Sequence, residues 1–162
     1  MKRSYDVISL IIKTSFQKTL KQSKSVFFFS NKLVMTNYLF VYGTLRKNAN
    51  SRAKWLLMNN SEYLGEGKIK AKLYRVSWYP AAVAFSEGDD ENAVVIGDVF
   101  RLNTPDETLK RLDEYEDVPV LYERTIVKVR MNSGACLDAW VYFYKQSVKT
   151  LSEIKSGDFL NP

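Results

Sequence analysis

The chain contains no histidine and a single cysteine, Cys136. Without histidine, neither a Ser-His-Asp triad nor a Cys-His pair can form, and metal sites that depend on imidazole ligands are excluded. One cysteine excludes an intramolecular disulfide, a CxxC redox pair and a cysteine-rich metal cluster, so we expect Cys136 to be an inert strand residue. If the protein is an enzyme, its proton transfers must use Asp, Glu, Lys or Tyr side chains.

The charge of the chain is concentrated in its first part. The 162 residues are 46% hydrophobic and 14% aromatic, which predicts one domain with a substantial core. The formal net charge is +6, and residues 1–34 hold seven basic residues and one acid, whereas residues 35–162 hold 17 of each sign. The neutral body gives no support to a nucleic-acid-binding function.

We interpret residues 1–34 as a basic extension, either a disordered or targeting segment or a stretch outside the mature protein, and residues 35–162 as the domain. Binding of nucleic acid by the lysines of the extension is a weaker alternative. The apolar stretch 7–12 is too short for a signal-peptide core or a membrane span. We therefore expect a cytoplasmic protein, or an organellar one if the extension is a transit peptide.

The body has the pattern of an α+β domain. Residues 38–42 are apolar on both faces, as in a central strand buried on each side. A sharp turn is expected after this strand, and Gly43 is expected to provide the conformational freedom that the turn requires. Several such strands favour a closed or nearly closed barrel. Further strands are predicted at 66–76, 81–85, 93–102, 122–131 and 135–144, with a short helix within 51–59.

The clearest helix signal begins at residue 104. Thr104 is a suitable N-cap, Pro105 suits the first helical position, and Glu107 stands where a capping box places its acid. If the helix continues to residue 116, Leu112 and Glu116 share its apolar stripe, and Glu116 faces inward.

An inward Glu116 would have a raised pKa. Partial burial, the neighbouring acids Asp113, Glu114 and Asp117, and the negative end of the helix dipole all act in that direction. A carboxyl group with a pKa near neutrality is suited to take and return a proton. The alternative is that the helix ends early and Glu116 lies with Asp117 in a solvated acidic turn.

The loop of Tyr42–Leu45 supplies a complementary feature. Backbone N–H groups exposed after a strand can bind a carboxylate or an oxyanion, and Gly43 would allow a ligand to approach. The alternative is an ordinary strand-ending turn in which Thr44 bonds to the backbone. Under both interpretations we expect Arg46 and Lys47 to be solvated.

Four segments, in order and spacing, resemble the gamma-glutamylcyclotransferase-like superfamily, and the branch that they resemble most is that of the gamma-glutamylamine cyclotransferases. The resemblance extends from residue 35 to the late SGDF segment at 156–159. It implies a small mixed β-barrel of about six strands with one main helix and one or two short helices. The segments are LFVYGTLR (39–46), LDEYE (112–116), YER (122–124) and AWVY (139–142).

The resemblance implies that Glu116 is the acid-base catalyst and that the loop binds a small gamma-glutamyl substrate through Tyr42, Gly43, Thr44 and Leu45. The implied reaction is an intramolecular aminolysis that releases 5-oxoproline and an amine, with no metal or organic cofactor. Tyr79, Tyr122, Arg124 and Tyr142 are candidate pocket residues. Arg124 is expected to pair either with a substrate carboxylate or with Asp113, and we favour a structural role for it.

The chain departs from the family pattern where Asn48, Ala71 and Asp117 replace frequent glycines. Asn48 can adopt a left-handed conformation, Ala71 is expected to tighten strand packing, and Asp117 could alter the pKa of the catalyst or signal a changed substrate. Two other functions stay open. One is a non-catalytic module that binds a small ligand, and the other is an acyl hydrolase with Thr44 as nucleophile and Glu116 as base.

Overall fold

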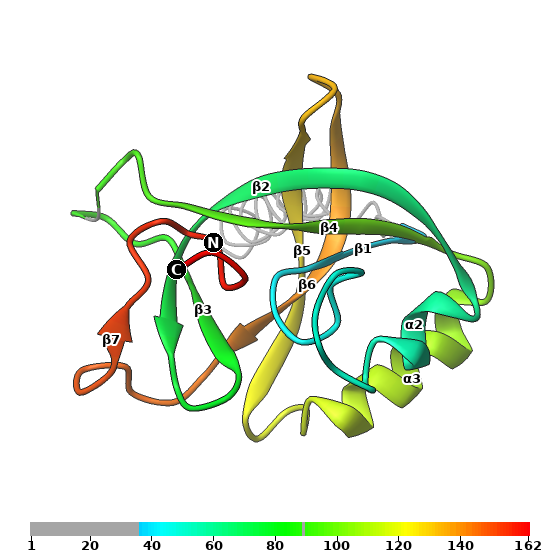
Figure 1. The fold of residues 1–162 in the computed structure, drawn as a ribbon, viewed down its shortest axis with the longest axis horizontal. Helices are drawn as coiled ribbons and strands as arrows, with labels where there is room; N and C mark the ends of the chain where they lie inside the picture. Colours follow the sequence, from blue (N-terminus) through cyan, green and yellow to red (C-terminus); the bar gives the residue numbers. More distant parts are fainter. Residues whose placement is uncertain (1–35, 89) are drawn as a thin grey trace, which may run out of the picture. The chain divides into compact units, whose positions relative to one another are not determined.

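The computed structural model describes residues 36–88 and 90–162, so the interpretation of residues 1–34 lies outside the described residues. The described unit, Thr36–Pro162, contains seven strands and two helices (Figure 1). The strands are β1 (Tyr38–Val41), β2 (Ser61–Arg75), β3 (Pro80–Ala84), β4 (Val94–Leu102), β5 (Tyr122–Met131), β6 (Cys136–Tyr144) and β7 (Ser152–Glu153), and the helices are α2 (Trp55–Met58) and α3 (Pro105–Tyr115).

Five of these strands close into a mixed barrel. They follow the order β2, β4, β1, β6, β5, and a pairing between β5 and β2 closes the ring. β1 runs parallel to β6, with Leu39 opposite Trp140, and the other pairings are antiparallel. β3 and β7 pair with the far half of β2. The predicted α+β barrel is therefore confirmed, with seven strands in place of about six.

The first strand separates two apolar cores. Phe40 lies within the barrel with Val99, Val129 and Val141 among its neighbours, and all four side chains are fully buried. Leu39 and Val41 face the other way, toward a second core. The prediction of a central strand buried on each side is confirmed. The second core includes Leu57 of α2 and Leu109 and Leu112 of α3, which attach the helices to the barrel.

Helix α3 begins at Pro105 as predicted, but the capping box is absent. The Thr104 side chain makes no cap hydrogen bond and instead accepts one from the amide of Asn60. Glu107 forms an ion pair with Arg111 at 2.8 Å, one turn along the helix. The capping prediction was wrong because a tertiary partner, from the segment after α2, competes for the same hydroxyl group.

Two strand boundaries also differ from expectation. β2 begins at Ser61 and extends over 15 residues, because a bulge between Tyr63 and Gly65 lets the strand continue along β4 despite the glycine, whose φ is +132°. β7 is a two-residue strand within a tail that has no clear pattern. None of the helices in the described part of the chain is long and apolar enough to cross a membrane.

Candidate active site

Residues from four distant parts of the described chain line one open pocket. The end of β1 and the following loop form one side, and Pro80 of β3, Glu116 after α3 and Tyr142 of β6 complete it. The empty volume is about 360 Å³, including the solvent at the open mouth. The lining residues are Phe40, Val41, Tyr42, Gly43, Thr44, Leu45, Pro80, Glu116 and Tyr142.

A tight turn forms the loop side of the pocket. The Arg46 N–H group donates to the Gly43 carbonyl oxygen at 3.1 Å, so that Thr44 and Leu45 are the central residues of the turn. No hydrogen bond within the described residues engages the N–H groups of Thr44 or Leu45. Both residues line the pocket, and their N–H groups have no partner among the described residues.

Gly43 is required for a reason different from the one expected. Its φ is not in the left-handed region, so the prediction that the turn needs its conformational freedom was wrong. A Cβ atom at this position would lie 2.7 Å from Cγ and 2.8 Å from Cδ of Pro80. The missing side chain lets β3 approach the loop, which brings Pro80 into the pocket wall.

Glu116 caps the carboxyl end of α3, where its N–H group donates to the Leu112 carbonyl oxygen at 2.8 Å. Its side chain is partly buried, and its carboxyl group makes no hydrogen bond or ion pair with a described residue. Burial raises the pKa of Glu116 to about 7. Of the three effects expected to raise this pKa, burial alone accounts for the rise, and neither the neighbouring acids nor the helix dipole is needed.

Asp117 turns the chain away from the helix. Its φ is +53°, and its carbonyl oxygen accepts hydrogen bonds of 2.8 Å from the N–H groups of Val120 and Leu121. This left-handed conformation favours glycine and tolerates aspartate. The side chain is exposed. Residue 117 therefore has a backbone conformation that a glycine would adopt without strain.

The two other departures have simpler accounts. Ala71 is fully buried opposite Ala84 in the ladder of β2 and β3, which agrees with a packing role. Asn48 is exposed and has no positive φ, so the loop does not require a left-handed residue there.

Three tyrosine hydroxyl groups hold the walls of the pocket in place. The Tyr42 hydroxyl donates to the Tyr142 carbonyl oxygen at 2.6 Å and accepts from the Ala82 N–H group at 3.3 Å. The Tyr122 hydroxyl donates to the Pro80 carbonyl oxygen at 2.8 Å. The third hydroxyl group is that of Tyr142, which donates to Asp113. Burial raises the pKa of Tyr42, Tyr122 and Tyr142 well above the ordinary value for tyrosine, so all three stay neutral at physiological pH.

Arg124 pairs with Asp113, one of the two partners expected for it, with its Nε atom 3.3 Å from Oδ1. The guanidinium also lies over the ring of Trp140, 4.8 Å from its centroid. Asp113 accepts a second hydrogen bond of 2.9 Å from the Tyr142 hydroxyl. The pair thereby fixes a side chain that lines the pocket.

Of the four candidate pocket residues, Tyr142 lines the pocket and the others stand behind or beside it. Tyr122 is buried behind Pro80. Tyr79 is partly exposed and packs edge-on against Trp78, with ring centroids 5.1 Å apart. Contact of Tyr79, Tyr122 or Arg124 with a substrate stays a prediction.

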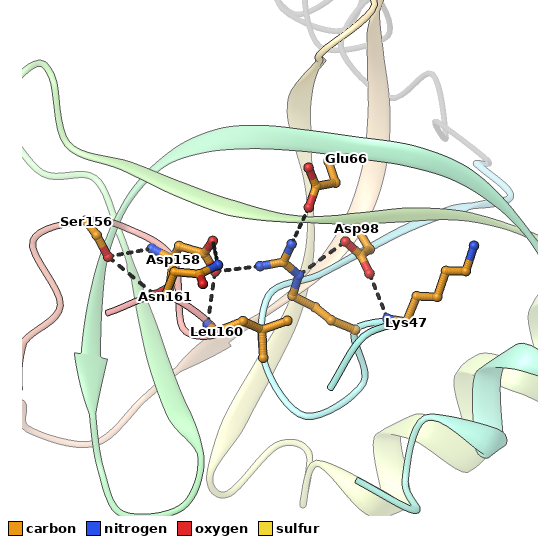
Figure 2. A network of polar contacts seen from close by, with 8 residues as sticks. Lys47, Glu66, Asp98, Ser156, Asp158, Leu160 and Asn161 are labelled. Atoms are coloured by element: carbon orange, nitrogen blue, oxygen red, sulfur yellow. Dashed lines mark hydrogen bonds and ion pairs between the residues drawn. The ribbon is translucent and has the colours of Figure 1, made fainter. Parts of the chain in front are cut away.

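Arg46 is buried, contrary to the expectation that it is solvated. Its side chain pairs with Asp98 at 3.1 Å, with Glu66 at 2.7 Å and with Asp158 at 2.7 Å (Figure 2). Asp98, which is also buried, accepts a further bond of 2.7 Å from the Lys47 N–H group. One arginine therefore joins the loop after β1 to β2, β4 and the carboxyl-terminal segment.

Groups next to Asp158 stabilise the charged form of its carboxyl group. Burial alone would raise the pKa of Asp158, but hydrogen bonds from Asn161 and Leu160 and the charge of Arg46 hold it below the ordinary value (Figure 2). Arg46 and Lys47 were both expected to be solvated, and of the two only Lys47 is exposed. Its Nζ atom lies 4.5 Å from the centroid of the Tyr63 ring.

Sequence reasoning missed Pro80, Asp98 and Asp158 as supports of this site. Pro80 stands directly before the predicted strand 81–85, and the two aspartates stand in the predicted strand 93–102 and in the SGDF segment at 156–159. Asp98 was the available signal, because it stands in the middle of the apolar run 94–100 and a buried carboxylate needs a partner.

The sequence model of the family described as gamma-glutamyl cyclotransferase, AIG2-like, matches residues 39–161. The chain belongs to this family. It is 34% identical over 122 residues to a protein of Methanocaldococcus jannaschii provisionally named a gamma-glutamylcyclotransferase, covering 75% of this chain and 94% of the relative. It is 35% identical over 125 residues to the gamma-glutamylcyclotransferase family protein YtfP of Escherichia coli K12, covering 76% and 96%.

Solved structures of this family share the fold. The solution structure of Escherichia coli YtfP has a TM-score of 0.54 at 33% identity, over 76% of this chain and 96% of that one. The crystal structure of a Pyrococcus horikoshii protein has a TM-score of 0.57 at 28% identity, over 78% and 92%. A mouse AIG2-like protein, at 20% identity and a TM-score of 0.61 over 74% and 86%, is similar in fold.

Proposed function

We propose that this family member is a gamma-glutamyl cyclotransferase that releases 5-oxoproline and a free amine from a gamma-glutamyl substrate. One observation supports the proposal. The carboxyl group of Glu116, which has no partner among the described residues and a pKa raised to about 7, lines the same pocket as Thr44 and Leu45, whose N–H groups are also free within the described part of the chain. This acyl transfer requires a general base whose pKa is near neutrality and a site that stabilises an oxyanion.

In the proposed reaction, Glu116 takes a proton from the α-ammonium group of the substrate. The amine nitrogen then attacks the γ-carbonyl carbon of the same molecule, and the N–H groups of Thr44 and Leu45 stabilise the oxyanion of the tetrahedral intermediate. Protonated Glu116 gives its proton to the leaving amine nitrogen as the original amide bond breaks. Glu116 then takes the second proton, which the attacking nitrogen loses as it becomes the lactam N–H group, and passes it to the released amine, which leaves as an ammonium ion. One C–N bond forms and one breaks, and no water is consumed.

The proposed steps are within the reach of the protein's own groups. Attacker and target belong to one molecule, so the pocket has mainly to hold the cyclic conformer. The buried tyrosines, whose hydroxyl groups are engaged by the backbone or by Asp113, keep the walls fixed around it. By resemblance to the gamma-glutamylamine branch, we propose a gamma-glutamyl amine as the substrate class.

Production of 5-oxoproline by the full chain tests the proposal. The panel comprises γ-glutamyl-ε-lysine, a γ-glutamyl amino acid and a small γ-glutamyl amine, with the product measured by mass spectrometry. We expect turnover of at least one compound, and Glu116→Gln should reduce it by at least about 100-fold. Glu114→Gln, on the exposed side of the same helix end, is the matched control and should retain activity.

Three outcomes would contradict the proposal. Full turnover by Glu116→Gln would exclude its role as acid and base. Thermal stabilisation by the compounds without product would instead favour a non-catalytic binding module. A covalent adduct on Thr44 would favour the hydrolase alternative.

A further inference from the structure

A second hollow of the described surface shares no residue with the pocket of Glu116. It lies beside the seam where β2 and β5 close the barrel and has a volume of about 470 Å³. This volume is within the range of small-molecule sites. Residues of β2, β4, β5 and β6 and of the loop before β4 form its wall.

The charge of this hollow is strongly positive. Lys68, Lys70, Lys128 and Arg130 line it, against a single acid, Glu91. Lys128 is compensated by an exposed ion pair with Asp138 at 3.1 Å. Lys68 and Arg130 form no ion pair with any residue of the described chain.

The strand register places two of these cations opposite each other. The seam of β2 and β5 consists of two residue pairs, Gly67 with Met131 and Lys68 with Arg130. Two like charges directly opposite each other on antiparallel strands repel and destabilise the pairing. The closure of the barrel therefore holds together two cations that would otherwise separate.

We propose that this hollow binds a small anion with clustered negative charge, of the phosphate or polycarboxylate type. Such an anion would convert the repulsion between Lys68 and Arg130 into attraction, because each cation then has a compensating partner. The guanidinium of Arg130 offers a planar pair of donors that fits phosphate or carboxylate oxygens. The site does not depend on the function proposed for the pocket of Glu116.

Cys136 provides a reporter for this site. It is the only cysteine of the chain, is exposed, and lies opposite Arg130 in the ladder of β5 and β6. It also lines the hollow. A bound anion should therefore slow the alkylation of Cys136 by iodoacetamide.

The experiment uses the full chain with pyrophosphate and citrate as separate probes, and sodium chloride at matched ionic strength as the screening control. We expect at least one probe to raise Tm and to slow the alkylation of Cys136. The double variant Lys68→Gln/Arg130→Gln should bind that probe at least about tenfold more weakly, since charge-assisted contacts are lost. Without any probe it should melt at the same or a higher temperature than the unmodified chain.

The double variant Lys110→Gln/Lys155→Gln removes two exposed cations elsewhere and should bind the probe normally. The proposal would be overturned if neither probe acted beyond sodium chloride, or if both double variants weakened binding equally. Tighter binding of a single-stranded oligonucleotide than of pyrophosphate at the same residues would also overturn it, since the surface would then fit a nucleic acid. A response to pyrophosphate alone would assign a phosphate ligand, and a response to citrate alone a polycarboxylate.

Discussion

At the residue scale, the proposed chemistry depends on one carboxyl group that has no partner among the described residues. Glu116 is partly buried next to a pocket, and no cation of the described chain compensates its charge. A carboxylate in this environment is disfavoured relative to water, so its pKa rises toward neutrality. The feature that destabilises the folded protein is the one that would make the residue useful as a base.

The pH dependence of turnover follows from this pKa. The deprotonated form of Glu116 must accept the proton from the substrate, so kcat/KM should increase as the pH rises through about 7. Initial rates between pH 5 and 9 for the best substrate of the panel would measure this limb. An acidic limb centred near pH 4.5, the ordinary value for a glutamate, would mean that burial does not act on the catalyst.

The same shift predicts a pH-dependent stability. The folded state binds more protons than the unfolded state between pH 4.5 and about 7, so Glu116 lowers the free energy of unfolding as the pH rises through this window. Glu116→Gln removes the effect and should be more stable by about 1–3 kcal/mol at pH 8. Urea unfolding at pH 4 and pH 8 measures both values. An equal difference at the two pH values would contradict the assignment.

At the scale of elements, the loop after β1 is fixed by contacts that come from outside it. Pro80 packs where Gly43 has no side chain, and Arg46 connects the end of the turn to carboxylates of β2, β4 and the carboxyl-terminal segment. A short loop has few contacts of its own and would not otherwise hold two N–H groups in one orientation. The loop is therefore a product of the packed barrel.

Arg46 should be far more important for stability than its place in a polar loop indicates. Arg46→Met leaves the buried carboxyl group of Asp98 without a countercharge and should lower the free energy of unfolding by about 3–5 kcal/mol. The free energy of unfolding of Arg46→Lys should lie between those of the original chain and Arg46→Met, because an ammonium group keeps the charge but cannot reproduce the planar fork of the guanidinium.

Arg101 offers a matched control, because its ion pair with Glu62 is exposed. Arg101→Met should change the free energy of unfolding by no more than about 1 kcal/mol. Urea denaturation of the three variants measures the differences. Equal losses for Arg46→Met and Arg101→Met would mean that the network around Arg46 adds nothing beyond a surface ion pair.

At the scale of the whole molecule, the family model matches residues 39–161, a range that contains the barrel and both described helices. Every residue that lines the proposed site lies within it. Residues 1–34 carry the whole excess of positive charge in the chain. We propose that this extension is separable from the enzyme.

A chain reduced to residues 35–162 should therefore keep its kcat/KM and its Tm within experimental error. It should also elute earlier from a cation exchanger, because an excess charge of +6 is removed. Steady-state kinetics and thermal melting of the full and the reduced chains provide the comparison. A loss of activity at unchanged Tm would assign the extension a part in substrate binding.

Local pattern was sufficient for the elements that have a clear periodicity. The strand at 122–131 has the predicted bounds, the helix begins at Pro105, and the double-sided apolar segment at 38–41 is the central strand. These features depend on neighbours within a few residues, which the sequence displays directly. The combination of the YGTLR and LDEYE segments was likewise enough to indicate the family.

The closure of the barrel and the construction of the site were decided only by tertiary structure. No local signal shows that β5 returns to β2, that Pro80 takes the space left by Gly43, or that Asp158 reaches Arg46 across 112 positions. Such contacts join segments far apart in the chain, and their partners are selected by the packing of the whole core. The sequence by itself determined which carboxyl group and which loop to consider, and the fold decided that they share a pocket, because only burial at that place gives Glu116 its raised pKa.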